Sequence, residues 1–312
     1  MDYLSGWCRS SRRLDGLTAV VTGCNTGIGK ETVADLYKRG ARVIMACRDV
    51  NKANIAKDLI EHAASTDKKG VLVVEKLDLS SLKSVREFAD RISASENRID
   101  ILVNNAGVMM CLEGKTEDGH ETHIGTNHLG HALLTLLLLP RLKENDASRI
   151  VFVSSYLHAK HLVDLEDMNF EKTRYDPYTA YCRSKAANVL FSKALAMELK
   201  KRNISNVTTY SLHPGVISTE IGRHFSESYM WGTSWLFAAI MRLFGKSVKC
   251  GAQTSIYCAV DEACAAESGL YYSECAVTTP SKQCRDDEFA AKFWDWTIKT
   301  LDLHSYDPFR TK

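Results

Sequence analysis

The sequence predicts an α/β fold: a doubly wound parallel sheet covered by helices on both faces, in three layers and a single domain. Short apolar runs of strand length alternate along the chain with helix-forming stretches, and no repeat or low-complexity linker interrupts the alternation. Strands that alternate with helices pair in parallel, because each crossover helix returns the chain to the end of the sheet at which the previous strand began. The 312 residues, 45% of them hydrophobic, are enough to bury a substantial core. We expect residues 1–15 to form a tail and residues 16–312 the domain.

The first strand, expected over residues 17–22, runs directly into a glycine-rich turn. A helical pattern follows this turn and continues to Arg39, where Gly40 stops it. Strand, glycine-rich turn and helix in this order are typical of a Rossmann-type fold, in which a pyrophosphate lies on the helix N-terminus. A tight turn that binds nothing is the alternative. The predicted cofactor contacts in this turn are Gly23, Asn25, Thr26, Gly27, Ile28 and Gly29.

The second strand, expected over residues 42–46, ends beside two charged residues, Arg48 and Asp49. An acid at this strand end would bind the adenosine ribose hydroxyls, whereas an arginine would accommodate a 2′-phosphate. Because both types are present and adjacent, spacing alone leaves the choice open by one residue. We favour Arg48 on the phosphate and Asp49 as the cap of the next helix, over residues 50–64. This interpretation favours NADP(H) over NAD(H).

Two further strands, expected over residues 71–77 and 101–103, end in residues suited to a bound nucleotide. Asp78 either accepts a hydrogen bond from the adenine amino group or caps the helix that follows, and the sequence leaves both roles open. Small and amide residues at the end of the next strand suit backbone contact with a ligand in the crevice. The predicted cofactor contacts here are Asp78, Leu79, Asn105, Ala106 and Gly107.

A proline-free, alanine-rich run from residue 178 to about 201 predicts a helix that carries Tyr181 and Lys185 on one face, four positions apart. A phenol with a pKa of about 10 is a poor proton acceptor at neutral pH, but a nearby cation favours its phenolate form. Reaching neutrality requires a pKa decrease of roughly 3, or about 4 kcal/mol, part of which Lys185 could supply. Many helices carry such a pair by chance, so the pair alone is weak evidence of an acid/base centre.

Three motifs in a fixed order make the assignment specific: Thr22-Gly-x-x-x-Gly-x-Gly29, Asn104-Asn-Ala-Gly107 and Tyr181-x-x-x-Lys185. Over roughly residues 14–275 the chain resembles the short-chain dehydrogenases/reductases. Stretches such as Ala-Cys-Arg-Asp and Asn-His-Leu-Gly-His are similar to the retinol dehydrogenase and retinal reductase branch. That branch mostly uses NADP(H), in agreement with the interpretation of Arg48.

The resemblance implies roles for further residues. Asn127 falls where the family keeps an asparagine that bends a helix and holds a relay water, and Ser155 falls where a serine meets the substrate oxygen; Ser154 lies one position away. A Pro-Gly turn after the strand expected over residues 206–212 is implied to face the nicotinamide. The predicted catalytic residues are Asn127, Ser155, Tyr181 and Lys185, with Ser155 as the substrate contact. The further predicted cofactor contacts are Tyr181, Lys185, Pro214, Gly215, Val216 and Thr219.

The implied activity is NADP(H)-dependent interconversion of a hydrophobic alcohol, retinol-like, with its aldehyde or ketone. Tyr181 would exchange the proton while hydride passes between cofactor and carbon. Two alternatives stay open: a reductase of steroids or other lipid carbonyls, and a nucleotide-sensing binding protein without turnover.

The composition narrows the expected partners to small molecules. A net charge of +2 without an arginine-rich run argues against nucleic acid. Ten cysteines without a Cys-x-x-Cys pair indicate reduced thiols facing the cytosol. His123, His128 and His131 have no cysteine or acid at a spacing that would complete a metal site, so none is expected.

Two segments suggest contact with a membrane surface. The tail combines Trp7 with three arginines, and residues 229–244 form an apolar run with two tryptophans that is shorter than the ~20 residues of a spanning helix. We expect a substrate lid near residues 218–249 and peripheral attachment on the cytosolic side of the endoplasmic reticulum or another internal membrane, with a cytoplasmic protein as the alternative. An apolar helix expected over residues 121–142 should pack on the sheet and is compatible with a homodimer.

Overall fold

The computed structural model describes residues 2, 5–64, 69–215, 217 and 246–310 of the chain. Val216 and Thr219, the apolar run 229–244 and most of the expected lid 218–249 lie outside these residues.

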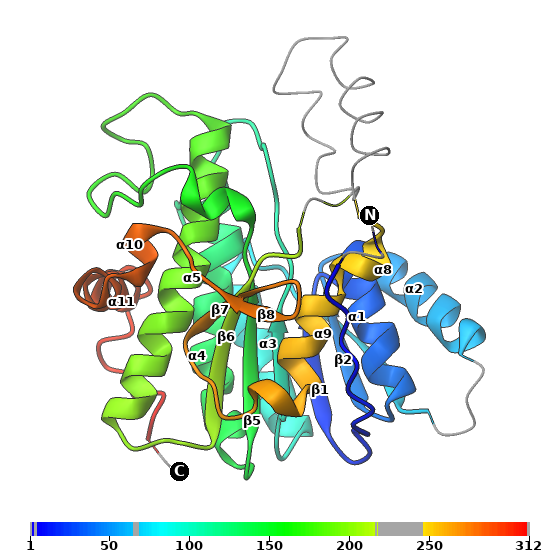
Figure 1. The fold of residues 1–312 in the computed structure, drawn as a ribbon. Helices are drawn as coiled ribbons and strands as arrows, with labels where there is room; N and C mark the ends of the chain where they lie inside the picture. Colours follow the sequence, from blue (N-terminus) through cyan, green and yellow to red (C-terminus); the bar gives the residue numbers. More distant parts are fainter. Residues whose placement is uncertain (1, 3–4, 65–68, 216, 218–245, 311–312) are drawn as a thin grey trace.

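The core of the structure is one sheet with the strand order β3-β2-β1-β4-β5-β6-β7-β8 (Figure 1). All neighbours pair in parallel except β7 and β8, which are antiparallel. The order runs outward in both directions from the β1/β4 neighbours, so the predicted doubly wound parallel sheet is confirmed. The strands are β1 (Thr18–Thr22), β2 (Arg42–Cys47), β3 (Val71–Lys76), β4 (Ile101–Asn104), β5 (Ser148–Val153), β6 (Val207–Leu212), β7 (Leu270–Ser273) and β8 (Ala276–Thr278).

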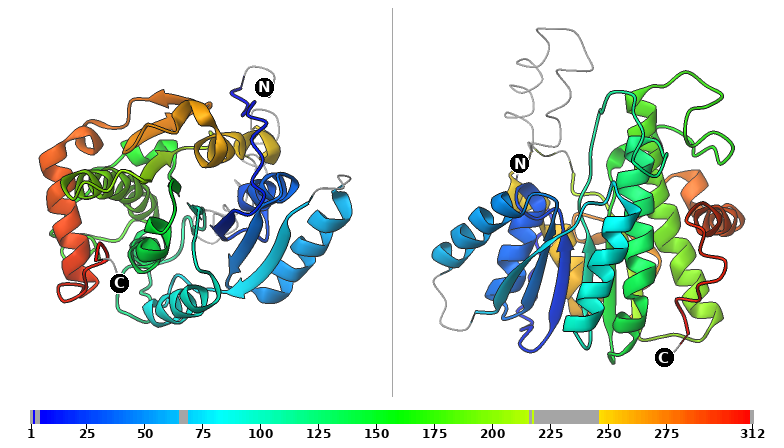
Figure 2. Two further views of the ribbon diagram at one scale, coloured as in Figure 1. Left: turned by 90° about the horizontal axis from the view of Figure 1, so that it is seen from below. Right: turned by 180° about the vertical axis from the view of Figure 1, so that it is seen from behind.

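Helices cover both faces of this sheet, as Figure 2 shows from two further directions. The helices are α1 (Gly27–Lys38), α2 (Val50–Ala63), α3 (Leu82–Ser95), α4 (Gly130–Lys143), α5 (Pro177–Lys201), α8 (Val248–Gly251), α9 (Gln253–Val260), α10 (Lys282–Arg285) and α11 (Asp287–Thr300). Shorter turns are the π-helix η2 (Ile124–Leu129) and the 3-10 helices η3 (Tyr156–Ala159) and η5 (Glu262–Cys264).

The two faces of the sheet have separate hydrophobic cores. Successive residues of a strand point to opposite faces, so Val20 joins the core formed with α3, α4, α5 and α11, while Ala19 and Val21 join the core formed with α1, α2 and α9. The three-layer arrangement expected from the alternating pattern is therefore present. Residues 5–14 run back along α1 and α9, where Cys8 N donates to Gln253 and Arg39 donates to the Ser10 carbonyl.

The helix expected over residues 121–142 is present without a gap from residue 122 to residue 143, but part of it is wound as a π-helix. Residues 122 and 123 are α-helical, the π-helix η2 follows, and the chain continues as α4. Gly130, at the junction, packs so closely that a Cβ atom there would lie 2.4 Å from the Leu79 carbonyl oxygen. Glycine at this position is thus required by a contact with a distant segment, which helix propensity does not report. Strand β8 was not predicted either; its three residues are all exposed.

Among the described residues no helix has both the length and the apolar character needed to cross a bilayer.

Candidate active site

The glycine-rich turn between β1 and α1 is shaped to let a ligand approach the backbone. Gly23 and Gly27 adopt positive φ angles of 60° and 58°, which side chains other than glycine rarely tolerate. A Cβ atom on Gly29 would lie 2.5 Å from Asn105 Nδ2. That amide donates to the carbonyl oxygens of Thr22 and Gly23, at 2.9 and 3.1 Å. Hydrogen bonds therefore join the glycine-rich turn to the motif that contains Asn105.

The N-terminus of α1 has unused hydrogen-bonding capacity. Its N-cap, Thr26, is extended and its side chain makes no capping hydrogen bond. The first backbone N–H groups of a helix have no partner within the helix and attract anions. This end of α1 therefore fits a pyrophosphate, in the position that the sequence predicts.

The structure resolves part of the ambiguity at the ends of β2 and β3. Asp49 is the N-cap of α2 and accepts from Lys52 N at 3.0 Å, as predicted, while Arg48 is exposed. The helix-capping alternative for Asp78 is wrong: α3 starts at Leu82 and its N-cap is Ser81. Asp78 lies too far upstream and accepts instead from the backbone N–H and hydroxyl of Ser80.

Tyr181, Lys185 and Ser155 converge beside the carboxyl end of β5. Tyr181 and Lys185 are 4% and 2% exposed on α5, and Lys185 Nζ lies 5.9 Å from the Tyr181 ring centroid. Ser155 hydrogen-bonds the Tyr181 side chain. Ser154 instead donates to the Lys185 carbonyl at 2.6 Å. It is Ser155, therefore, that reaches the phenol.

The charge states of this pair differ from the expectation. Burial raises the pKa of Tyr181 to about 12, against a smaller opposite effect of the Ser155 hydrogen bond. Burial also lowers the pKa of Lys185 to about 8. Lys185 Nζ donates to the Val153 carbonyl at 3.1 Å. It does not lower the pKa of Tyr181 towards neutral pH. At neutral pH Tyr181 is therefore a protonated phenol, the form that donates a proton.

Asn127 lies in the π-helix η2, fully buried, and joins three segments of the site. Its Oδ1 accepts from Val108 N at 2.8 Å, and its Nδ2 donates to Val108 O and Ser184 Oγ, both at 2.9 Å. A Cβ atom on Gly107 would lie 3.1 Å from Lys185 Nζ and 3.2 Å from Asn127 Oδ1. Single π-turns within helices are frequent at functional sites, and here the turn brings Asn127 to the same point as Lys185.

Two polar residues at the site were not predicted. Thr22 Oγ1 accepts from the backbone N–H groups of Asn105 and Ala106, at 2.9 and 3.0 Å, and contacts His131 at 2.8 Å. The Ser184 hydroxyl donates a hydrogen bond to the Tyr181 carbonyl and accepts one from Asn127 Nδ2. A hydroxyl residue at a strand end or between Tyr181 and Lys185 was visible in the sequence, but its partners come from distant segments.

The three histidines in η2, in α4 and directly before η2 all make structural contacts. His123 binds Glu121, His128 contacts Thr297, and His131 contacts Thr22. Burial lowers the pKa of His128 to about 3 and that of His131 to about 4, so both are neutral. In the part of the chain that the structure describes, no three metal-binding side chains come together.

The predicted contacts after β1, β4, β5 and β6 all lie at the carboxyl ends of the parallel strands. Pro214 and Gly215 follow β6 directly, and Gly215 has a φ of 87° and donates its N–H to His213. The β1/β4 neighbours form the point at which the strand order reverses, where ligands bind in open α/β sheets. The predicted contacts after these four strands therefore lie at one end of the sheet, while Val216 and Thr219 lie outside the described residues.

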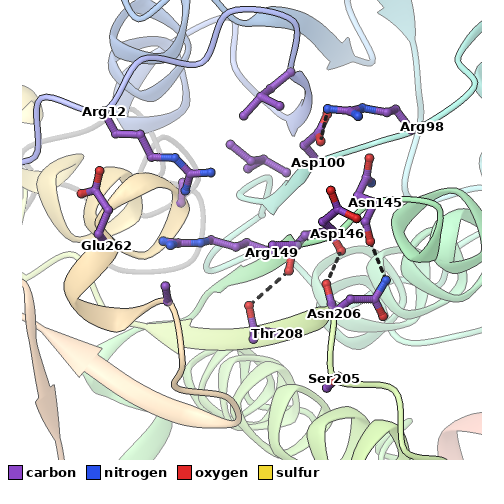
Figure 3. Close-up of a pocket in the computed structure, with 16 residues that line it drawn as sticks. Arg12, Arg98, Asp100, Asn145, Asp146, Arg149, Ser205, Asn206, Thr208 and Glu262 are labelled. Carbon is purple, nitrogen blue, oxygen red and sulfur yellow. Dashed lines mark hydrogen bonds and ion pairs between the residues drawn. The ribbon is translucent and has the colours of Figure 1, made fainter.

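A cavity of about 420 Å³ lies at the opposite end of the sheet (Figure 3). Its lining includes Asp100 and Asn206, which precede β4 and β6, and Arg149 of β5. Arg149 is 6% exposed and donates to the Cys258 carbonyl at 3.1 Å. Because Tyr181 lies at the carboxyl ends of the strands, this cavity is separate from the candidate active site.

Comparisons with known proteins agree with the geometry. The family model described as short chain dehydrogenase matches residues 17–229. Human retinol dehydrogenase 11 is 48% identical over 96% of this chain and 90% of its own length, and mouse retinol dehydrogenase 13 is 43% identical over 97% and 89%. A crystal structure of an uncharacterized protein from Mycobacterium paratuberculosis has a TM-score of 0.74 with 32% identity, covering 96% of this chain and 98% of its own. The Pseudomonas aeruginosa RhlG/NADP active-site complex, 24% identical, shares the fold with a TM-score of 0.63 over 83% of this chain and 94% of its own.

The buried tyrosine and lysine on one helix, the glycine-rich turn and these similarities lead to one conclusion. The chain belongs to the short-chain dehydrogenase family and is an oxidoreductase of the alcohol dehydrogenase type, which uses a nicotinamide dinucleotide.

Proposed function

We propose that this protein interconverts retinol-like alcohols and their aldehydes with NADP(H). The observation that carries the proposal is the convergence of Ser155, Tyr181 and Lys185, with Lys185 Nζ beside Gly107. The names of its relatives, among them retinol dehydrogenases 11, 12 and 13, support a retinoid substrate. NADPH, when bound, supplies the hydride for carbonyl reduction.

In this mechanism the side chains of the chain place the substrate and move one proton. Tyr181, protonated at neutral pH, donates its proton to the carbonyl oxygen as hydride reaches the carbon, and takes a proton back in alcohol oxidation. Ser155 hydrogen-bonds the reacting oxygen and fixes its position beside the phenol. Lys185 and Asn127 meet next to Gly107, where Lys185 would bind the nicotinamide ribose and Asn127 would hold a relay water.

Three exposed apolar side chains in the segments after β4 and β5, which we call the apolar rim, support a hydrophobic substrate. Leu112, Tyr156 and Leu162 are 60%, 54% and 70% exposed, which is high for large apolar side chains. They lie in the segments that follow β4 and β5, downstream of Asn105 and Ser155. Apolar side chains exposed beside a binding site are available for contact with a hydrophobic ligand or a membrane surface.

Turnover measurements test the function directly. All-trans-retinal should be reduced with NADPH at a higher kcat/KM than short aldehydes, because a long apolar chain buries more surface against the rim. The panel should contain steroid ketones and other lipid aldehydes, with NADPH and NADH each supplied. A preference for steroid ketones would favour the alternative reductase. NADPH binding with no oxidation across the whole panel would favour a nucleotide-sensing protein.

Arg48 is proposed to select NADP(H). Its side chain is exposed at the end of β2, whereas the neighbouring acid, Asp49, is engaged in capping α2. Arg48→Ala should raise KM for NADPH by about ten- to a hundredfold, the worth of one charge-assisted hydrogen bond, and should change KM for NADH little. Lys52→Ala, an exposed cation in the first turn of α2, is the matched control. Equal changes for both cofactors would contradict the assignment.

We further propose peripheral attachment to the cytosolic side of an internal membrane, such as the endoplasmic reticulum. Trp7, 37% exposed, and the apolar rim provide the surface. The protein should float with anionic liposomes, and replacing Trp7, Trp231 and Trp235 together by alanine should reduce the floated fraction several-fold. The two latter tryptophans lie outside the described residues. Sedimentation of the parent protein away from the vesicles would contradict attachment and favour a cytoplasmic protein.

We also propose a homodimer, which light scattering would test.

A further inference from the structure

The peptide of Cys111 is held from both sides. Its N–H donates to His123 Nε2 at 3.2 Å, and its carbonyl accepts from the Tyr175 hydroxyl at 2.9 Å. The preceding residue, Met110, is 2% exposed and has a φ of 56°. A non-glycine residue with positive φ is sparsely populated and persists where its surroundings hold it. The contacts on Cys111 supply that restraint.

The histidine in this arrangement is itself fixed by a buried carboxylate. His123 and Glu121 are 0% and 2% exposed, and His123 Nδ1 lies 2.7 Å from Glu121 Oε1. Because Nε2 accepts the Cys111 N–H, the proton of the neutral ring lies on Nδ1, which donates to Glu121. The carboxylate also accepts from the backbone N–H groups of His123 and Ile124 at 2.9 and 2.8 Å. Glu121 therefore orients the ring.

These residues adjoin the predicted acid/base residue. The His123 and Tyr181 rings meet edge to face, with centroids 6.2 Å apart. Residues 108–111 start from Val108, whose N–H and carbonyl both bind Asn127, and end at the Cys111 peptide. The segment 108–111 is thus anchored at both ends, close to Tyr181 on α5. A simple helix-capping role would explain the backbone contacts of Glu121 but not the contacts of His123 and Tyr175 with Cys111.

We propose that Glu121, His123 and Tyr175 are positioning residues that hold the Cys111 peptide, so that residues 108–111 form a rigid wall placing the substrate beside Tyr181. The inference rests on the proposed carbonyl reduction and adds the residues that set substrate placement. The wall carries the apolar side chains of Val108 and Met110. None of the three positioning residues needs to touch the reacting atoms.

A matched pair of substitutions at His123 separates the two contacts of the ring. The amide of glutamine reaches as far as Nε2, so His123→Gln keeps an acceptor for the Cys111 N–H. The amide of asparagine occupies the position of Nδ1, so His123→Asn keeps a donor to Glu121 but loses Cys111. We expect His123→Asn to raise KM for a long apolar aldehyde by about five- to tenfold, with kcat and the Kd for NADPH within about twofold, and His123→Gln to stay within about threefold of the parent.

Tyr175→Phe provides a second test because it removes the donor to the Cys111 carbonyl, together with the 3.4 Å contact between the Tyr175 hydroxyl and His123 Nδ1, and leaves the His123 side chain itself unchanged. It should raise KM for the same aldehyde in the same direction. This variant also keeps the proposal testable if His123→Asn does not fold, which thermal unfolding would show. Equal KM values for His123→Asn and His123→Gln, together with a parental KM for Tyr175→Phe, would overturn the proposal.

Thiol alkylation gives a readout that does not depend on turnover. Cys111 is partly exposed, as are Cys8 and Cys275, which lie elsewhere and serve as internal controls. Iodoacetamide followed by peptide mass spectrometry should modify Cys111 several-fold faster in His123→Asn and Tyr175→Phe than in the parent, with Cys8 and Cys275 unchanged. If the parent reduces no carbonyl compound, the proposed function fails and this measurement still decides whether the peptide is held. Unchanged Cys111 reactivity in both variants would refute the holding role.

Discussion

Tyr181→Phe should lower the rate of carbonyl reduction by about a hundred- to ten-thousandfold, the usual contribution of a positioned general acid. The change removes one oxygen and leaves the ring, which is 4% exposed, in its packing. Because burial raises the pKa of Tyr181 to about 12, the parent phenol carries its proton throughout the neutral range. The variant keeps Ser155 to bind the reacting oxygen but has no proton to give. Its deficit should therefore lie in kcat and should not depend on pH between about 6 and 8.

Cofactor binding distinguishes this loss from general damage. A titration followed by NADPH fluorescence should give Tyr181→Phe a Kd for NADPH within about threefold of the parent value, because the substitution leaves the glycine-rich turn and α1 unchanged. Tyr178→Phe, one helical turn earlier on α5, is the matched control and should reduce carbonyl compounds at nearly the parental rate. A Tyr181→Phe protein that binds NADPH and works at the parental rate would remove Tyr181 from the mechanism.

Features set by short stretches of sequence were predictable. The strand β1, the glycine-rich turn and α1 depend on β-branched residues, glycines and helix formers that lie next to one another, and each was found within about two residues of its expected position. Asp49 is similar, because an N-cap acts on amides two or three residues ahead in the chain. The geometry of such features is set by residues close together in the chain, so the local sequence is sufficient to predict them.

Features set by contacts between distant segments were not predictable. In and after the π-helix η2, Asn127 binds Val108 and Gly130 packs against Leu79, and no pattern within the helix reports these contacts. The pKa of Tyr181 is a second case. Spacing places Lys185 on the correct face of α5, but only the structure shows that its Nζ donates to Val153 and that burial dominates.

Replacing Lys185 by methionine should abolish carbonyl reduction and yet stabilise the cofactor-free protein at pH 7. Lys185 is 2% exposed, and burial lowers its pKa from 10.5 to about 8. The folded state therefore binds this proton less readily than the unfolded chain, so at pH values below 8 folding has to overcome the full cost of a buried ammonium. The difference between the two pKa values corresponds to roughly 3 kcal/mol.

Part of this gain is offset by a lost hydrogen bond. Lys185 Nζ donates to the Val153 carbonyl at 3.1 Å, but Asn188 Nδ2 also approaches that oxygen at 3.5 Å, so the carbonyl keeps one partner. With about 1 kcal/mol subtracted for the lost bond, the expected gain in the free energy of unfolding is about 2 kcal/mol at pH 7. Urea unfolding measures this directly, and Lys200→Met, at an exposed position of the same helix, should change stability by less than about 0.5 kcal/mol.

The pH dependence identifies the cause of the gain. The penalty in the parent is complete below pH 8 and disappears as pH rises through 8 towards 10.5, because the folded protein then holds a neutral amine and the unfolded chain loses its advantage in binding the proton. The stability difference between Lys185→Met and the parent should accordingly shrink by most of its value between pH 7 and pH 10. A gain that is equal at both pH values would point to better packing of methionine. A loss of stability at pH 7 would show that the ammonium contributes more to the folded site than its burial costs.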